Sequence, residues 1–166
     1  MALVKVQELK TGNWKYVEID DKQLDSLNKI NEEFVDYNQL QSFIDRLEIK
    51  PEIKVLLESL RNFSIKIGNI ILNIGRKILE LIIYIYHNFP NALIGTIIGF
   101  TIGMIISSIP ILGWALSWLI TPLSTALGTW YGLKSDLQNK ALKTEIITII
   151  SDIFGPLQGV KIDEPK

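Results

Sequence analysis

The stretch that decides the fold is residues 88–133, NFPNALIGTIIGFTIGMIISSIPILGWALSWLITPLSTALGTWYGL, which contains no Asp, Glu, Lys or Arg. Residues 1–87 carry 12 Lys/Arg and 13 Asp/Glu, and residues 134–166 carry five of each. A bilayer interior disfavours charged side chains, and so long an uncharged run is unusual in a globular domain of this size. The distribution of charge therefore predicts a mainly α-helical membrane protein.

The uncharged run divides into two apolar legs, residues 92–106 and 111–128, on either side of a turn. Each leg is slightly shorter than the roughly 20 residues that cross a hydrocarbon core. We expect residues 89–133 to fold into a glycine-rich transmembrane helical hairpin. Basic residues flank the run at both ends and are missing from the turn, so the positive-inside rule predicts the inner (cytoplasmic) membrane with both termini cytoplasmic.

Small residues recur at intervals of about four along both legs, which places them on one face of each helix. The residues expected to form this packing or oligomerisation face are Gly95, Gly99, Gly103, Ser107, Gly113, Ser117 and Thr121. Small side chains allow the close backbone approach by which helices associate in lipid. An equally weighted alternative is that the two small faces only pack the legs of one hairpin against each other.

Over residues 91–132 this pattern resembles a glycine-zipper membrane segment, and the hairpin resembles the hydrophobic hairpin of colicin-type pore-forming domains. The first resemblance implies self-association around a close-packed helix interface, sometimes around a pore. Aromatic residues near both ends of the second leg are expected to anchor it at the two membrane–water interfaces. These expected anchors are Trp114, Trp118, Trp130 and Tyr131. Pro122 lacks an amide donor, which predicts a kink in this leg.

Residues 51–88 show apolar residues every three or four positions, which predicts one long amphipathic helix from Pro51 to His87. In a ring of subunits, its polar stripe would line an aqueous vestibule. The candidate lining residues are Asn69, Asn73, Arg76 and Glu80. The simpler alternative, which we favour, is that this stripe faces solvent or lipid headgroups.

Residues 1–50 are expected to form a small cytoplasmic module for regulation or docking. Two short β-prone runs flank Gly12 and Asn13, which predicts a β-hairpin. A helix capped by Asp20 or Asp21 and a second helix over residues 39–48 should follow. In residues 134–166 we expect an amphipathic helix that ends near Gly155 and a frayed tail.

Catalysis finds little support in the sequence. The chain has no Cys and one His, so it contains neither a thiol nucleophile nor a histidine-rich metal site. Phosphate-binding glycine loops, GxSxG and HExxH motifs are missing as well. We therefore expect a non-enzyme without cofactor or metal, and the net charge of −1 argues against a nucleic-acid partner.

The leading hypothesis from sequence is a small homo-oligomeric membrane protein that perturbs or permeabilises the inner membrane, as a pore-forming toxin or defence effector does. The alternative is a non-conducting membrane anchor or adaptor that recruits a cytoplasmic protein through residues 1–50. A third possibility is a helical bundle that buries residues 92–132 as its central hairpin and exposes them to lipid only after a trigger.

Overall fold

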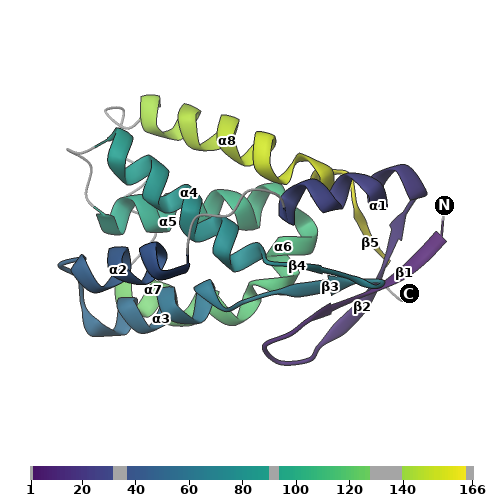
Figure 1. Cartoon of the computed structure of the whole chain (residues 1–166), viewed down its shortest axis with the longest axis horizontal. Coiled ribbons are helices and arrows are strands. Elements are labelled where there is room, and N and C mark those ends of the chain that lie inside the picture. The colour runs from purple at the N-terminus through teal and green to yellow at the C-terminus, as the bar shows by residue number, and fades with distance from the viewer. Residues whose placement is uncertain (1, 32–36, 90–93, 128–139, 164–166) are drawn as a thin grey trace.

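The computed structural model describes residues 2–31, 37–89, 94–127 and 140–163. Five strands form one antiparallel sheet in the order β4-β3-β1-β2-β5 (Figure 1). Helices gather at one end of the sheet and along one of its faces (Figure 1). The strands are β1 (Ala2–Glu8), β2 (Trp14–Ile19), β3 (Ile65–Ile67), β4 (Ile70–Leu72) and β5 (Lys161–Asp163).

The predicted N-terminal hairpin is confirmed, with β1 paired to β2 from Ala2–Ile19 to Gln7–Trp14. Gly12 has a φ of 84°, a conformation that glycine adopts without the steric penalty of a Cβ atom. The buried carboxylate of Glu8 accepts hydrogen bonds from the Thr11 hydroxyl at 2.7 Å and the Gly12 amide at 3.0 Å. The turn therefore satisfies its own donors with a side chain from the preceding strand.

The first helix begins where the sequence predicts, whereas the helix expected over residues 39–48 begins at Tyr37 and ends at Arg46. Asp20 caps α1 (Asp21–Leu27) by accepting from the Gln23 amide at 2.7 Å, and the Gln23 side chain accepts from the Asp20 amide at 2.9 Å. This reciprocal pair is a capping box. The 3-10 turn η1 (Asn28–Asn31) follows, then α2 (Tyr37–Arg46) and α3 (Pro51–Arg61). Pro51 occupies the first turn of α3, where its missing amide donor costs nothing.

The prediction of one long helix over residues 51–88 is wrong. After α3 the chain forms the β3–β4 hairpin, and only then α4 (Ile74–Asn88). The hairpin turns at Gly68, which has a φ of 59°, and β3 pairs with β1. Alternation at Ile65, Lys66 and Ile67 buries both isoleucines and exposes the lysine, so the local period is that of a strand.

The prediction of a transmembrane hairpin over residues 89–133, and with it a pore-forming membrane fold, is also wrong. The segment contains α5 (Ile94–Ser108), α6 (Pro110–Ala115) and α7 (Ser117–Leu127). Among the described residues, no helix is both long and apolar enough to cross a bilayer. The 15 residues of α5 extend only about 22 Å, against a hydrocarbon core of about 30 Å.

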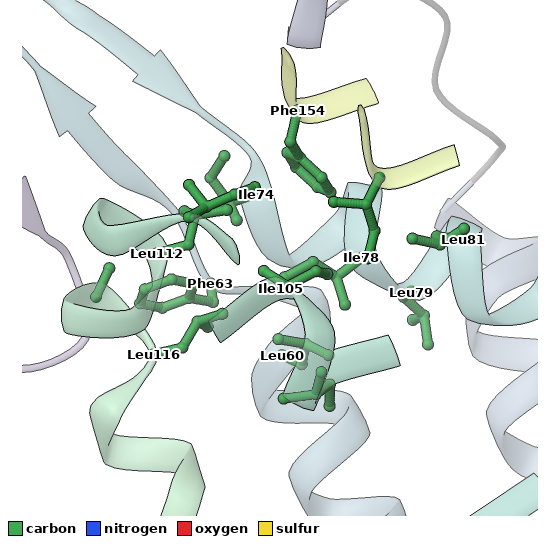
Figure 2. Close-up of a cluster of buried hydrophobic side chains, with 14 of the residues drawn as sticks. Leu60, Phe63, Ile74, Ile78, Leu79, Leu81, Ile105, Leu112, Leu116 and Phe154 are labelled. Atoms are coloured by element: carbon green, nitrogen blue, oxygen red, sulfur yellow. The ribbon is translucent and has the colours of Figure 1, made fainter. Parts of the chain in front are cut away.

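The apolar segment instead forms the centre of the protein core. Figure 2 shows buried side chains from several helices, together with Phe63 and Leu116 from the segments that follow α3 and α6, meeting in one cluster. The buried side chains include Leu60 of α3, Ile78 of α4, Ile105 of α5 and Leu112 of α6. Leu116, which follows α6, and Phe154 of α8 (Lys140–Gln158) are buried with them. Burial among neighbouring helices removes the same apolar surface from water that a bilayer would remove.

The exposed positions of this uncharged segment explain why it needs no charged residues. Within residues 94–125, the exposed positions carry small hydroxyl side chains or proline, namely Ser107, Ser108, Pro110, Ser117, Thr121, Pro122 and Thr125. Hydroxyl groups meet water without charge; the Ser107 hydroxyl also donates to the Gly103 carbonyl at 2.8 Å. The charged exterior is supplied by other elements, such as the lysines at Lys140 and Lys143 on α8.

The C-terminal prediction is partly wrong. The sequence predicts that this helix ends near Gly155, but α8 continues through Gly155 and Pro156 to Gln158. The segment expected to fray contains β5, which pairs with β2 through Val17–Ile162. The last described residues therefore complete an edge of the sheet. In Figure 1, α8 runs beside α1 before the chain enters β5.

Candidate partner-binding surface

The sheet has one buried face and one exposed face. Val6, Val17 and Ile19 point into the core, together with inward-facing residues of β3 and β4. The opposite side of the β1–β2 hairpin carries Leu3, Lys5, Trp14 and Tyr16, all exposed. We call this set of four residues the hairpin face.

Large apolar groups are concentrated on the hairpin face. Leu3 is 55% exposed, Trp14 51% and Tyr16 44%. Isolated apolar residues at a surface are ordinary, but an exposed group of neighbouring apolar and aromatic side chains often marks an interaction site. Tryptophan and tyrosine are also the residue types that contribute most to binding energy at protein interfaces.

The side chains of the hairpin face are ordered by contacts with one another. The rings of Trp14 and Tyr16 lie 5.4 Å apart, edge to face at 81°. The Lys5 ammonium group lies 5.0 Å from the centroid of the Trp14 ring, and in the strand register Lys5 is opposite Tyr16. A preordered surface loses less conformational entropy when a partner binds.

Positive charge accompanies the aromatic groups. Lys66 of β3 is opposite Gln7, which is in turn opposite Trp14, so Lys66 extends the exposed row toward β4. No carboxylate lies opposite Lys5 or Lys66 in the described strand register. At the other edge Glu18 is opposite Lys161, and these two charges offset each other. The side of the face near β3 is therefore basic.

Two further lysines of the hairpin join it to the helices. The Lys10 ammonium group lies 4.6 Å from the centroid of the Trp118 ring, and that of Lys15 lies 5.9 Å from the centroid of Trp114. Trp118 also contacts the Phe63 ring at 5.4 Å. Such cation–π contacts contribute about 0.5–2 kcal/mol each, depending on desolvation. They hold the hairpin, and the surface it carries, against α6 and α7.

The structure places two of the predicted membrane anchors in these internal contacts. Trp114 and Trp118 are half-buried against the hairpin and the core. Trp130 and Tyr131 lie outside the described residues. Pro122 lies inside α7, and the interruption of the second leg falls between α6 and α7 at Leu116.

The predicted helix-packing residues do not share one environment. Gly99 is buried, while Gly95, Gly103 and Gly113 are half-buried; Ser107, Ser117 and Thr121 are exposed. Close approach is evident at Gly113, where an added Cβ atom would lie 2.8 Å from the Ile106 carbonyl oxygen. This contact joins α6 to α5 within one hairpin. Assembly into a homo-oligomer stays a prediction.

The candidate vestibule residues do not lie along one helix. Asn69 belongs to the β3–β4 turn, and Asn73 precedes α4 and accepts a hydrogen bond from the Ser64 hydroxyl at 3.1 Å. Arg76 and Glu80 are half-buried on α4. These four residues are spaced three or four positions apart, as on one helix, but Asn69 and Asn73 flank β4 and only Arg76 and Glu80 lie on a helix.

The hairpin face was only partly predictable. In the second strand of the predicted hairpin, Val17 and Ile19 are buried and alternate with Tyr16 and Glu18. The same alternation applies to Leu3, Lys5 and Trp14 and places all three on the face of the hairpin away from the buried valines, a signal that the sequence analysis did not use. No protein-family model, curated protein or solved structure matches this chain.

Proposed function

We propose that this protein is a recruiting module that binds another protein through the hairpin face. The partner segment is apolar and acidic: apolar groups cover Leu3, Trp14 and Tyr16, and carboxylates approach Lys5 and Lys66. The observation that carries this proposal is the ordered pair of exposed aromatic rings with a lysine over one of them. This function corresponds to the adaptor alternative from the sequence, but it does not require a membrane anchor.

A displayed library of random peptides, selected on the full chain, tests the partner chemistry. We expect enriched peptides to combine Asp or Glu with aromatic or branched apolar residues. Trp14→Ala should weaken their binding about 30-fold, since a central aromatic anchor contributes about 2 kcal/mol. Ile147→Ala is the matched control, because Ile147 is an exposed apolar residue on α8, 42% exposed, away from the hairpin.

Charge reversal separates the electrostatic part of the proposal. Lys5→Glu should weaken the same peptides about tenfold and remove much of their sensitivity to salt, while Lys143→Glu should change little. Peptides that bind Trp14→Ala as tightly as the original chain would refute the proposed surface. Enrichment of basic peptides would refute the proposed partner chemistry.

A second candidate function, contact with lipid after a trigger, is supported by one specific observation. The uncharged segment is enclosed by helices that bear the charges, and α8 covers it partly through Phe154. Loosening α8 would expose α5, which could then enter the interface of a bilayer without crossing it. Phe154→Ala should therefore increase dye release from anionic vesicles; release equal to that of Ile147→Ala would remove this candidate.

A further inference from the structure

A cavity of about 440 Å³ lies between α2 and α4, away from the hairpin face. Its size is within the range of small-molecule binding sites in proteins. The apolar part of its lining comes from Phe43, Leu47, Ile83 and Tyr86. The polar part comes from Gln39, Arg46 and His87.

Aromatic rings form an ordered wall of this cavity. Phe43 meets Tyr86 edge to face, with centroids 5.6 Å apart and an interplanar angle of 75°. The His87 ring lies 6.3 Å from Phe43 at 81° and 6.0 Å from Tyr86. A flat or branched apolar group that enters the cavity would contact ring faces and edges together with Leu47 and Ile83.

The polar part of the lining is rich in hydrogen-bond donors. The Nε group of Arg46 donates to the Ser42 carbonyl at 3.2 Å, which holds the guanidinium near α2 and leaves its two Nη groups for a ligand. Carboxylates are missing from the described lining, and the nearby Asp45 accepts from Gln41 at 2.8 Å. An arginine that faces no carboxylate among the described lining residues favours an anion, which it contacts in a planar, two-point geometry.

We propose that this cavity binds a small organic carboxylate with an aromatic or branched apolar body. The body lies against Phe43, Ile83 and Tyr86, and the carboxylate accepts hydrogen bonds from Arg46. Gln39 and His87 supply further polar contacts. The site is separate from the proposed partner surface, because the cavity between α2 and α4 lies at the end of the protein away from the sheet.

The test uses two probes of nearly equal shape, 1-naphthoate and the neutral 1-naphthylmethanol, in an amide-resolved NMR titration of the full chain. A ligand with this number of heavy atoms should bind with a dissociation constant on the order of 1 mM or below. We expect 1-naphthoate to bind about tenfold more tightly than 1-naphthylmethanol, because only the carboxylate forms charge-assisted hydrogen bonds. The largest shifts should fall on residues of α2 and α4.

Two variants locate the contacts. Arg46→Gln should remove the preference for 1-naphthoate and leave 1-naphthylmethanol unchanged, whereas Lys143→Gln, which removes an exposed lysine on α8, should alter neither probe. Ile83→Phe should fill part of the cavity and weaken both probes. Because Arg46 is exposed, its replacement leaves the core intact.

The proposal is overturned if the two probes bind equally, if Arg46→Gln keeps the preference for the carboxylate, or if the shifts map to the sheet. A folded Ile83→Phe chain with the original affinity would also overturn it. Loss of peptide binding at the hairpin face has no bearing on these results, so the two proposals fail independently.

Discussion

Of Gly12, Gly68, Gly75, Gly113, Gly155 and Gly159, Gly75 should tolerate a side chain least. It lies in the first turn of α4, directly against the end of α3. A Cβ atom added to it would lie 1.6 Å from the Leu60 carbonyl oxygen and 3.0 Å from the Phe63 Cβ atom. Since ordinary contact begins near 3.4 Å, Gly75→Ala requires α3 and α4 to separate by about 1.8 Å.

The cost of that separation follows from the contacts at the junction. Forced overpacking costs about 1–3 kcal/mol and occasionally more. The hydrogen bond from the Gly75 amide to the Phe63 carbonyl, 3.1 Å long, would be strained or lost, which adds about 1 kcal/mol. Alanine returns about 1 kcal/mol through its higher helix propensity. We expect the free energy of unfolding to fall by about 1–3 kcal/mol, and Tm by about 2–12 °C.

Two other glycines provide matched controls. Gly113→Ala meets the Ile106 carbonyl oxygen at 2.8 Å, a milder conflict that should cost about 1 kcal/mol. Gly155→Ala in α8 meets nothing within 4 Å and should change stability by about 0.5 kcal/mol or less. Urea unfolding followed by far-ultraviolet circular dichroism measures all three. Equal stability of Gly75→Ala and Gly155→Ala would refute the described packing of α3 on α4.

The remaining predictions concern the ends and turns of elements, and the same unfolding assay checks each. Asp20→Ala removes the capping box of α1 and should cost about 1 kcal/mol, whereas Asp21→Ala should cost clearly less; the reverse order would contradict the assigned cap. Gly68→Ala forces a Cβ atom into a positive-φ turn and should cost about 1–2 kcal/mol, with Gly68→Asn less harmful; equal effects would argue against that turn. Glu8→Ala removes the side-chain acceptor of the Thr11 amide and hydroxyl, while the Gly12 amide keeps the Glu8 backbone carbonyl as its acceptor at 3.1 Å. The change should cost about 1–3 kcal/mol, and an unchanged stability would exclude this role.

Local signals predicted the parts of the fold that depend on local chemistry. Gly12 indicated a hairpin turn, the Asp20–Asp21 pair a helix cap and Pro51 a helix start, because each residue type has a backbone preference that acts over a few residues. All three are confirmed. The same rule was missed at Gly68, where a Gly-Asn pair again joins two short β-prone runs.

The environment of the apolar segment could not be deduced from its own residues. An uncharged helix is stable wherever water is excluded, and both a bilayer and a protein core exclude it. The difference lies in whether other elements have apolar faces to cover the segment. Here α4, the helix before α5, provides one through Ile78, and α8, which follows much later in the sequence, provides another through Phe154.

The cavity and the hairpin face were inaccessible for a related reason. Phe43 and Tyr86 are 43 positions apart, and their ring contact depends on how α2 packs on α4. Periodicity assigns each residue to a face of its own helix but does not specify the partner of that face. The aromatic residues Trp114 and Trp118 were likewise assigned to membrane interfaces because their lysine partners are about 100 positions away.

In the structure, α5 is buried in the core of the protein by neighbouring helices. Hydrogen–deuterium exchange of the full chain in detergent-free buffer, resolved by peptide, measures that burial. Since α5 packs against α4, α6 and α8, its amides should be among the slowest to exchange and should keep the same protection when lipid vesicles are added. Rapid exchange of α5 in buffer, with protection that appears only in the presence of vesicles, would contradict the account.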